Sequence, residues 1–433
     1  MSYSRFMIPA LALLLAGCSE DPTSSAQVPT PEKSFGKKLQ TQLVMAQPGD
    51  VIEIPEGFYA LDRSLTLSVD GVTIRGAGMD KTILSFKNQV AGAEGMMITA
   101  SDFTLEDLAI EDTKGDSIKI NQAKNIVIRR VRSEWTNGPS TENGSYGFYP
   151  VMTENTLIED SVVIGASDAG IYVGQSYNVV IRNNRAEYNV AGYEIENTIG
   201  ADVYNNVATN NTGGVLIFNM PYLTQPGHST RIYNNEIYSN NTENFAPKGT
   251  AVASVPAGSG ILINSNDNVE IFGNNLKDND TANIIVSSLL TADYQEEYKV
   301  SDNFDPFPEG IFIYDNTYSG GGTSPGRLEL KALKVAQFGL TGRLPDILWD
   351  GVINPGKLAD GNASVDTVLC IDDAAAGFIN VDAGNDFKGI STDKSPHNCR
   401  MKKMAAIDLG TLDSKDDNTL STLETSDNTS KEG

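Results

Sequence analysis

A short motif recurs along this chain, in which a glycine precedes an apolar residue, a variable residue and a second apolar residue. Five copies are present: Gly170-Ile-Tyr-Val173, Gly192-Tyr-Glu-Ile195, Gly214-Val-Leu-Ile217, Gly260-Ile-Leu-Ile263 and Gly310-Ile-Phe-Ile313. The first three copies begin 22 residues apart, and each reads as one short strand. A period in this range that joins short strands through Asn and Gly turns is typical of a parallel β-helix. Equivalent residues of successive coils then lie about 4.8 Å apart, so the repeat predicts which side chains are neighbours.

The repeats also set the expected extent of the solenoid. Short alternating strands broken by glycine recur from about residue 49 to 323, which predicts about eleven coils in an all-β fold. Parallel strands joined in one direction should wind right-handed. Phe35, Leu39 and Leu43 repeat every four residues, so we expect a short helix that caps the first coil. After Gly322 the pattern decays into a segment that we expect to cap the other end.

The N-terminus has the form of a bacterial lipoprotein signal. Arg5 precedes an apolar run from Phe6 to Leu15 that is too short to span a membrane, and Ala-Gly-Cys18 follows. We expect cleavage before Cys18 and lipidation of its thiol, which would anchor the protein to a membrane; an ordinary cleaved signal is the alternative. Ser19 resembles the residue after the cysteine in Gram-negative lipoproteins sorted to the outer membrane, so we expect a cell-envelope location. The sequence thus predicts six segments: a lipoprotein signal peptide (1–17), a flexible tether (18–33), an N-terminal cap (34–48), a right-handed parallel β-helix (49–323), a C-terminal cap with a disulfide (324–410) and a disordered tail (411–433).

Charge and cysteine content limit the partners of the chain. The formal net charge is −24 at pH 7, which argues against nucleic acid because phosphate binding needs clustered Lys and Arg. The charge argues less strongly against an anionic polysaccharide, which needs only a local basic patch. Apart from Cys18, which we expect to be lipidated, the chain has Cys370 and Cys399, and in an exported protein we expect these two to form one disulfide. With only two histidines no His-rich metal centre is expected, and we expect a monomer.

Asparagines and charged residues recur in register outside the triplets. Each of four second strands ends in an asparagine (Asn184, Asn206, Asn235 and Asn274), and another follows five residues later: Asn189, Asn211, Asn240 and Asn279. We interpret both sets as stacked turn asparagines that hydrogen-bond along the solenoid, rather than as a ligand-binding row. Arg129, Glu159 and Arg182 share a third column. Their alternating charge favours a cross-strand ion-pair ladder over an arginine that binds a uronate.

The middle residue of each triplet should point away from the core. Read coil by coil, this outward row contains Lys119, Tyr149, Tyr172, Glu194, Leu216, Leu262 and Phe312. Its first four members have side chains that can take part in catalysis or ligand binding. They lie beside the first of three insertions, which cover about residues 135–146, 219–229 and 243–258. We therefore expect a groove whose wall includes Trp135, Asn137, Asn143 and Tyr146. An exposed sheet face of good strand formers is the simpler alternative.

Further polar residues lie just outside this row, namely Asp168, Gln175, Glu196 and Asn197. The candidate catalytic residues are Lys119, Tyr149, Asp168, Tyr172 and Glu194. The candidate substrate-binding residues are Trp135, Asn137, Asn143, Tyr146, Gln175, Glu196 and Asn197. Asp168, Glu194 and Glu196 have the oxygen ligands that calcium prefers, although acidic residues are abundant here by chance; no other cofactor is expected.

Three segments carry a resemblance to a known group: Asn143–Val151, Ala166–Ser176 and Asn189–Asn197. They resemble the pectin-lyase-like right-handed β-helix proteins, and within these a family of bacterial lipoproteins with parallel β-helix repeats. The resemblance implies carbohydrate as a ligand class, because that superfamily contains polysaccharide lyases, glycoside hydrolases, pectin esterases and uronan epimerases. The sequence lacks the Asp-Pro-His of mannuronan epimerases, the Gly-His-Gly of polygalacturonases and the arginine motif of pectate lyases. Asp372-Asp373 is expected to form a turn.

Two hypotheses for function follow. In the first, the protein is a lyase or epimerase of an acidic polysaccharide, with Tyr149 or Tyr172 as the base and Lys119 or an arginine stabilising the developing charge. In the second, it is a noncatalytic outer-membrane lipoprotein that binds glycan or a partner protein through the same face, or has a structural role. Either way, we expect the function to lie near residues 116–197 and the later repeats to serve as scaffold.

Overall fold

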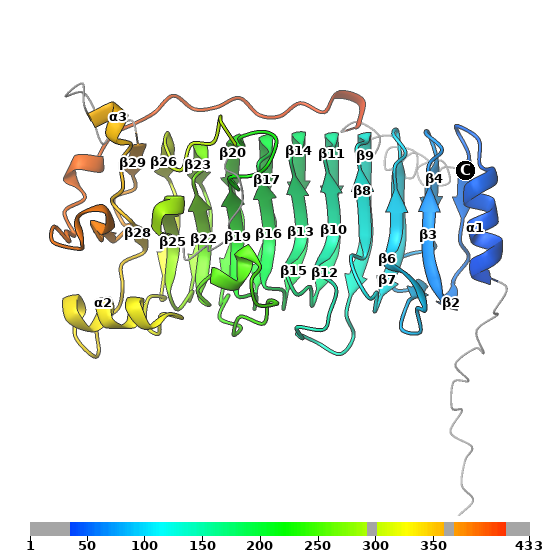
Figure 1. Cartoon of the computed structure of the whole chain (residues 1–433), viewed down its shortest axis with the longest axis horizontal. Coiled ribbons are helices and arrows are strands. Elements are labelled where there is room, and N and C mark those ends of the chain that lie inside the picture. Colours follow the sequence, from blue (N-terminus) through cyan, green and yellow to red (C-terminus); the bar gives the residue numbers. More distant parts are fainter. Residues whose placement is uncertain (1–34, 292–300, 359–367, 413–433) are drawn as a thin grey trace, which may run out of the picture. The chain divides into compact units, whose positions relative to one another are not determined.

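The computed structural model describes residues 35–291, 301–358 and 368–412 as a stack of short parallel strands (Figure 1). The expected signal peptide and tether, including Cys18, lie outside the described residues, as does the tail from residue 413. An eleven-stranded sheet, here sheet B, forms one side of the solenoid. Its strands are β3 (Arg63–Leu67), β6 (Ala91–Ile98), β8 (Ile118–Asn121), β10 (Tyr146–Val151), β13 (Ala169–Gly174), β16 (Ala191–Glu196), β19 (Gly213–Phe218), β22 (Ser259–Asn264), β25 (Ala282–Ser287), β28 (Ile347–Trp349) and β30 (Phe378–Asn380).

A second sheet, here sheet A, completes each coil with two rows of strands, and β7 (Thr104–Glu111) and β9 (Lys124–Glu134) run through both rows. The first row also contains β1 (Val51–Glu53), β4 (Thr73–Arg75), β11 (Glu154–Glu159), β14 (Tyr177–Arg182), β17 (Ile199–Tyr204), β20 (His228–Tyr233), β23 (Asp267–Phe272), β26 (Ile311–Tyr314) and β29 (Leu369–Asp372). The second also contains β2 (Gly57–Ala60), β5 (Thr82–Ser85), β12 (Val162–Ile164), β15 (Arg185–Glu187), β18 (Val207–Thr209), β21 (Glu236–Tyr238), β24 (Asn275–Lys277) and β27 (Thr317–Ser319). The predicted all-β parallel β-helix is confirmed.

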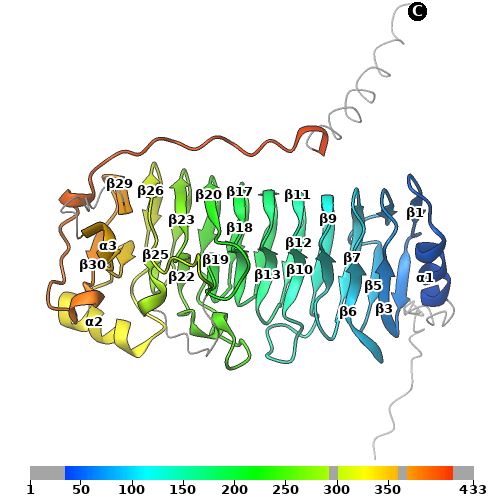
Figure 2. The same ribbon diagram turned by 45° about the horizontal axis from the view of Figure 1, so that its top comes forward.

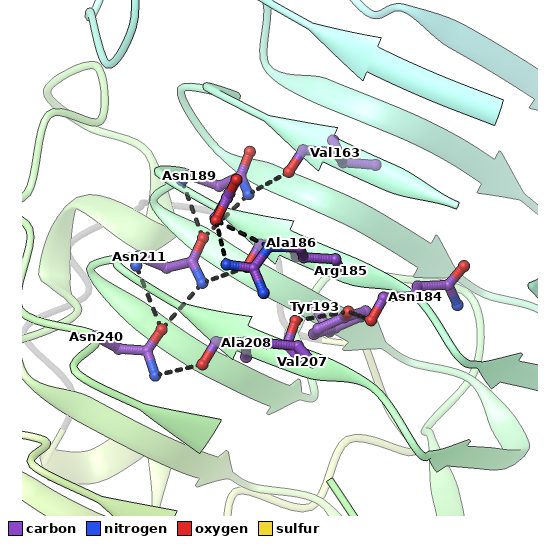
Figure 3. Close-up of polar contacts among 11 residues, drawn as sticks. Val163, Asn184, Arg185, Ala186, Asn189, Tyr193, Val207, Ala208, Asn211 and Asn240 are labelled. Carbon is purple, nitrogen blue, oxygen red and sulfur yellow. Dashed lines mark hydrogen bonds and ion pairs between the residues drawn. The ribbon is translucent and has the colours of Figure 1, made fainter. Parts of the chain in front are cut away.

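The apolar members of the triplets form the core, as their alternation predicts. Ile171, Val173, Ile195 and Ile217 are fully buried, because successive side chains of a strand point to opposite faces. Tyr193 also points inward, and its hydroxyl donates hydrogen bonds to the carbonyls of Asn184 and Val207 (Figure 3).

Two buried asparagine ladders run along the solenoid, as the sequence predicts. Asn189, Asn211 and Asn240 form part of one (Figure 3): the Nδ2 of Asn189 donates to Oδ1 of Asn211 at 3.0 Å, and Asn211 donates to Asn240 at 2.9 Å. The other links Asn184, Asn206, Asn235, Asn274 and Asn316. Both ladders end at carboxylates, which accept from the last asparagine and have no donor that would need a further acceptor. Asp373 accepts from the backbone N–H of Asn316, and Asp346 accepts from Nδ2 of Asn283.

The ladder explains the glycine that begins the triplets. A Cβ on Gly170 would lie 2.8 Å from Nδ2 of Asn189, and one on Gly192 would lie 3.0 Å from Nδ2 of Asn211. Glycine is therefore required where the ladder amide approaches the backbone, so the two sequence repeats are parts of one packing arrangement.

The fifth triplet, Gly310–Ile313, does not belong to sheet B. The prediction that Phe312 follows Leu262 in the outward row is therefore wrong. Phe312 lies in β26 of sheet A, opposite Glu270, and the next outward residue of sheet B after Leu262 is Ile285. Gly310 has a φ of 68° and lies beside Asn268, so it serves a left-handed turn before the strand. The same sequence motif thus has two structural explanations: close approach of a ladder asparagine in sheet B and a left-handed turn before a strand of sheet A.

Charged residues on sheet A form the expected ion-pair ladder. Glu159 forms ion pairs with Arg129 at 3.3 Å and with Arg182 at 2.7 Å, and Arg182 also donates to the hydroxyl of Tyr204 at 3.1 Å. Arg129 and Glu159 are buried, so this column has no free arginine for a uronate.

A helix covers the first coil, and the strands of the solenoid continue beyond the predicted limit at residue 323. The expected helix α1 (Phe35–Met45) buries Leu39 and Leu43 over the first coil. Beyond residue 323, β28 and β30 extend sheet B and β29 extends sheet A. This part of the chain also contains the helices α2 (Leu328–Phe338) and α3 (Pro355–Leu358). The predicted disulfide between Cys370 and Cys399 is present. Within the described part of the chain, no helix is long and apolar enough to cross a bilayer.

Candidate functional site

The predicted outward row is present on sheet B at the centre of the solenoid. Lys119 lies opposite Tyr149 in the β8–β10 ladder, and Tyr172 lies opposite Glu194 in the β13–β16 ladder. The register of β10 and β13 places Tyr149 beside Tyr172. One lysine, two tyrosines and one glutamate therefore follow one another on four adjacent coils.

Three tyrosines form the middle of this site. The ring of Tyr146 stacks on Tyr149 with centroids 4.3 Å apart, and Tyr172 contacts both rings at 4.8 Å. The ammonium of Lys119 lies 4.9 Å from the centroid of the Tyr149 ring and 3.7 Å from a carboxylate oxygen of Asp116. Tyr149 thus has a cation on one side and a phenol on the other.

Carboxyl groups line the opposite side of the tyrosines. The hydroxyl of Tyr172 donates to Oε1 of Glu196 at 2.8 Å, and that of Tyr146 donates to Oδ2 of Asp168 at 3.3 Å. Gly174 makes the first contact possible, since a Cβ there would lie 2.0 Å from the Tyr172 hydroxyl. A glycine in β13, in register with Glu196, is therefore needed for the phenol to reach that carboxylate.

The members of the site differ in their access to solvent. Tyr172 is 3% exposed and Glu194 is 2% exposed, whereas Lys119, Tyr149 and Glu196 are half-buried. The expected row is therefore not an open groove along its whole length. A ligand can reach Lys119, Tyr149 and Glu196 directly, while Tyr172, Asp168 and Glu194 support them from below.

Burial changes the protonation of the three carboxyl groups. Burial, followed by the charge of Glu196, raises the pKa of Asp168 to about 7. Burial also raises the pKa of Glu196 to about 7, against the hydrogen bond from Tyr172. The pKa of Glu194 lies well above its usual range because of burial and the charges of Asp168 and Glu196, so Glu194 keeps its proton near neutral pH. The cluster is thus a proton-sharing site near neutral pH.

Burial also raises the pKa of Tyr146, Tyr149 and Tyr172, reinforced by the nearby carboxylates. A phenol whose pKa is raised stays protonated at neutral pH and can donate a proton or a hydrogen bond. This differs from the expectation that Tyr149 or Tyr172 acts as the base. The group suited to that role is Glu196, whose pKa of about 7 is matched to neutral pH.

The expected wall residues mostly hold the first insertion in place. Nε1 of the buried Trp135 donates to the carbonyl of Thr113, and Nδ2 of Asn143 donates to the carbonyls of Gly138 and Gly165. Asn137 is exposed within the insertion. Of the four predicted wall residues, only Tyr146 has a contact with the tyrosines and carboxyls.

The other two insertions also reach this part of the solenoid. Gln175 accepts from Thr224 at 2.9 Å, and the amide of Asn197 exchanges hydrogen bonds with Gln225 and Met220, so these residues fix the second insertion. In the third insertion, the carbonyl of Phe245 accepts from the hydroxyl of Thr141 at 2.9 Å. Phe245 packs against the apolar cluster that contains Tyr172.

Sequence reasoning missed Asp116 and Phe245. Asp116 is detectable in retrospect, because it precedes the outward Lys119 by three residues. Burial raises the pKa of Asp116 to about 6, while Lys119 opposes this shift. Phe245 had no local signal, because its contact depends on the path of an insertion 104 residues from Thr141.

The carboxyls do not fit the calcium site that their residue types suggest. Among the described residues, no three His, Cys, Asp or Glu side chains are placed to hold a metal ion. Asp168 and Glu196 instead accept hydrogen bonds from the hydroxyls of Tyr146 and Tyr172.

Comparisons with known proteins agree with this fold. Residues 62–224 match the family described as right handed beta helix region, which also confirms the expected handedness. The mannuronan C-5 epimerase AlgE4 A-module of Azotobacter vinelandii is similar in structure, with a TM-score of 0.51 and 18% identity over 74% of this chain and 87% of the module. The AlgE6 A-module of the same organism gives a TM-score of 0.48 and 17% identity over 78% and 88%. DFA-IIIase of Arthrobacter chlorophenolicus A6 gives 0.44 and 12% over 75% and 91%. No curated protein sequence shows significant similarity, and at these identities the structural likeness shows the fold alone.

Proposed function

We propose that this right-handed parallel β-helix of the pectin-lyase-like fold is an extracytoplasmic protein that binds an acidic polysaccharide and acts on it by acid–base chemistry. The observation that carries the proposal is the placement of Tyr149 between Lys119 and the Tyr172–Glu196 pair. The AlgE4 module of the same fold is a mannuronan C-5 epimerase, which makes a uronate polymer a reasonable first substrate to test.

The reaction that suits this site is removal of the proton next to a uronate carboxylate. Glu196 would accept the proton as a carboxylate, and the Tyr149 phenol would donate one to the other face or to the leaving oxygen. Lys119 would stabilise the negative charge that develops on the sugar carboxylate. Return of a proton to the carbon gives an epimer, whereas loss of the glycosidic oxygen gives an unsaturated end.

Hydrolysis suits the site less well. Glycoside hydrolases hold two carboxyl groups about 5 Å or more apart across the bond that breaks. Here Asp168 is 7% and Glu194 is 2% exposed, so the two carboxyl groups are too buried to flank a sugar bond. Their role in this proposal is to position Tyr146 and to set the charge around Glu196.

A panel of polymannuronate, polyguluronate, pectate and glycosaminoglycans tests the proposal. We expect one member to yield unsaturated ends that absorb in the ultraviolet, or epimerised residues visible by NMR. The burial of Tyr172 and Glu194 favours a second candidate, in which the site binds glycan without turnover. Binding without product from the wild type, retained in the Tyr172→Phe plus Glu194→Gln variant, would support that candidate and reject the enzyme.

We also propose that the protein is anchored by lipid at Cys18 to the outer membrane of a Gram-negative bacterium. The disulfide supports an oxidising compartment, because such bonds persist outside the cytoplasm. The wild type should incorporate a labelled fatty acid and fractionate with outer membranes, whereas Cys18→Ser should do neither. Equal labelling of the two proteins would reject the anchor.

A further inference from the structure

A segment at the C-terminus lies across the strands of sheet A. After Cys399 the chain turns back, and residues 400–412, here the C-terminal strap, run from the last coils towards β9 (Figure 2, red). Nε of Arg400 pairs with Asp372 at 2.5 Å, and the ammonium of Lys403 lies 4.2 Å from the Tyr314 ring. Residues 400–409 form no strand of their own. Side chains of the solenoid, and not strand pairing, therefore hold the strap.

The strap covers one outward column of sheet A, here the strap column. In register from coil to coil it contains Val127, Leu157, Val180, Asp202, Arg231, Glu270, Phe312 and Cys370. All of these except Arg231 are at most 3% exposed, although they point away from the core. Leu409, Ile407 and Leu412 pack on the apolar end of the column, and Met401 packs near Phe312.

Two carboxylates of the column bind the backbone of the strap. The N–H of Met404 donates to Oε1 of Glu270 at 2.8 Å, and the N–H of Ile407 donates to Oδ2 of Asp202 at 3.1 Å. Burial raises the pKa of both acids, and these hydrogen bonds oppose the shift. Without the strap, both carboxylates would lose a donor, while the apolar end would be exposed to water.

The spacing of the strap matches the spacing of the coils. Met404 and Ile407 are three residues apart, and their partners Glu270 and Asp202 are two coils apart, with Arg231 between them. An extended chain of the polyproline II type advances about 9 Å in three residues, and two coils span about 9.6 Å. Met401, Met404 and Ile407 can therefore face the column at every third residue, whereas Ala405 and Ala406 are exposed.

We propose that the strap column is a peptide-docking groove whose ligand is the C-terminal segment of this chain, bound in cis within one copy and able to bind in trans from a second copy. Recognition rests on the two carboxylates at two-coil spacing and on the apolar surface of Val127, Leu157 and Val180. The partner it fits is an extended segment with apolar residues at every third position and free backbone N–H groups at the second and third of them. This proposal is independent of the chemistry on sheet B.

The test uses the full-length chain and a fluorescent peptide of residues 400–412. Ile407→Glu with Leu409→Glu should dislodge the resident strap, because the new charges face the apolar end of the column. The matched control, Ala405→Glu with Ala406→Glu, adds the same charge at exposed positions and should leave the strap seated. We expect the peptide to bind the first variant and to bind the wild type and the control at least tenfold more weakly, as measured by fluorescence anisotropy.

The peptide itself supplies a second comparison. Methylation of the Ile407 nitrogen removes the donor to Asp202 and should weaken binding about tenfold or more, whereas methylation of the Ala406 nitrogen should have little effect. No binding to the dislodged variant, or equal binding to wild type and variant, would overturn the proposal. Hydrogen exchange tests the proposal in the wild type, without any substitution. The amides of Met404 and Ile407 should exchange through local opening of the strap, and therefore faster than the amides of sheet B. Exchange of these amides only through global unfolding would also overturn it.

Discussion

The Glu196→Gln variant should lose turnover of a uronate polysaccharide by about 10²- to 10⁴-fold, the usual contribution of a general base. Glutamine keeps an oxygen that can accept the hydrogen bond from Tyr172, so the local geometry should survive. What it loses is the ability to take a proton. We therefore expect kcat to fall while binding of the polymer, measured separately, changes little.

The pH dependence of wild-type turnover provides a second test of the role of Glu196. Burial raises the pKa of Glu196 to about 7, and the base works only as the carboxylate. Activity should therefore rise with pH and reach half its maximum near pH 7, whereas Glu196→Gln should show only a low and flatter profile. Glu187→Gln is the matched control, because Glu187 lies on sheet A and pairs with Arg185. Wild-type turnover in the Glu196 variant, or loss of turnover in the control, would reject the assignment.

The fold and the outward row were predictable because both depend on strict local periodicity. Alternation along a strand fixes which of Ile171, Tyr172 and Val173 point inward, and a constant coil length fixes that Tyr172 lies beside Glu194. The asparagine ladders follow from the same period. Once their register is known, the glycine of each triplet has a steric reason.

The burial of the site was not predictable in the same way. Phe245 of the third insertion packs against the cluster that contains Tyr172 and is held by Thr141 of the first insertion, a contact between segments distant in sequence. The base assignment changed for the same reason, since burial raises the pKa of the tyrosines. Likewise, the strap contact between Ile407 and Asp202 joins residues 205 positions apart and has no local signature. Phe312 shows a different failure of sequence reasoning. The same local motif occurs there, but its strand belongs to sheet A and not to sheet B.

Breaking the buried asparagine ladder should have the largest effect on stability. In Asn211→Ala, the backbone N–H and Nδ2 of Asn189 lose their acceptor, and the Ala186 carbonyl loses its donor, all in a fully buried position (Figure 3). Each such orphaned group costs about 1 to 3 kcal/mol, so we expect the free energy of unfolding to fall by about 4 kcal/mol after partial relaxation. Denaturant unfolding followed by circular dichroism measures the change.

Asn178→Gly is the control for this experiment. Asn178 donates to Asn155 on the exposed side of the solenoid and has a φ of 53°, a conformation that glycine adopts freely and that Gly200 provides on the next coil. We expect this substitution to change the free energy of unfolding by less than about 1 kcal/mol. Equal losses in the two variants would mean that the buried ladder contributes no more than a surface hydrogen bond.

Asn211→Asp separates the loss of a donor from the loss of volume. The aspartate can accept from Asn189, but as a carboxylate it cannot donate to Ala186 or Asn240, so burial beside two acceptors should raise its pKa in the folded state. A carboxyl whose pKa is higher in the folded than in the unfolded chain stabilises the fold less as pH rises between the two values. The free energy of unfolding of Asn211→Asp should therefore fall, relative to that of Asn211→Ala, as pH is raised from about 4 towards neutrality. Parallel pH profiles for the two variants would show that the ladder does not depend on the amide donor, and that the asparagines are chosen for shape alone.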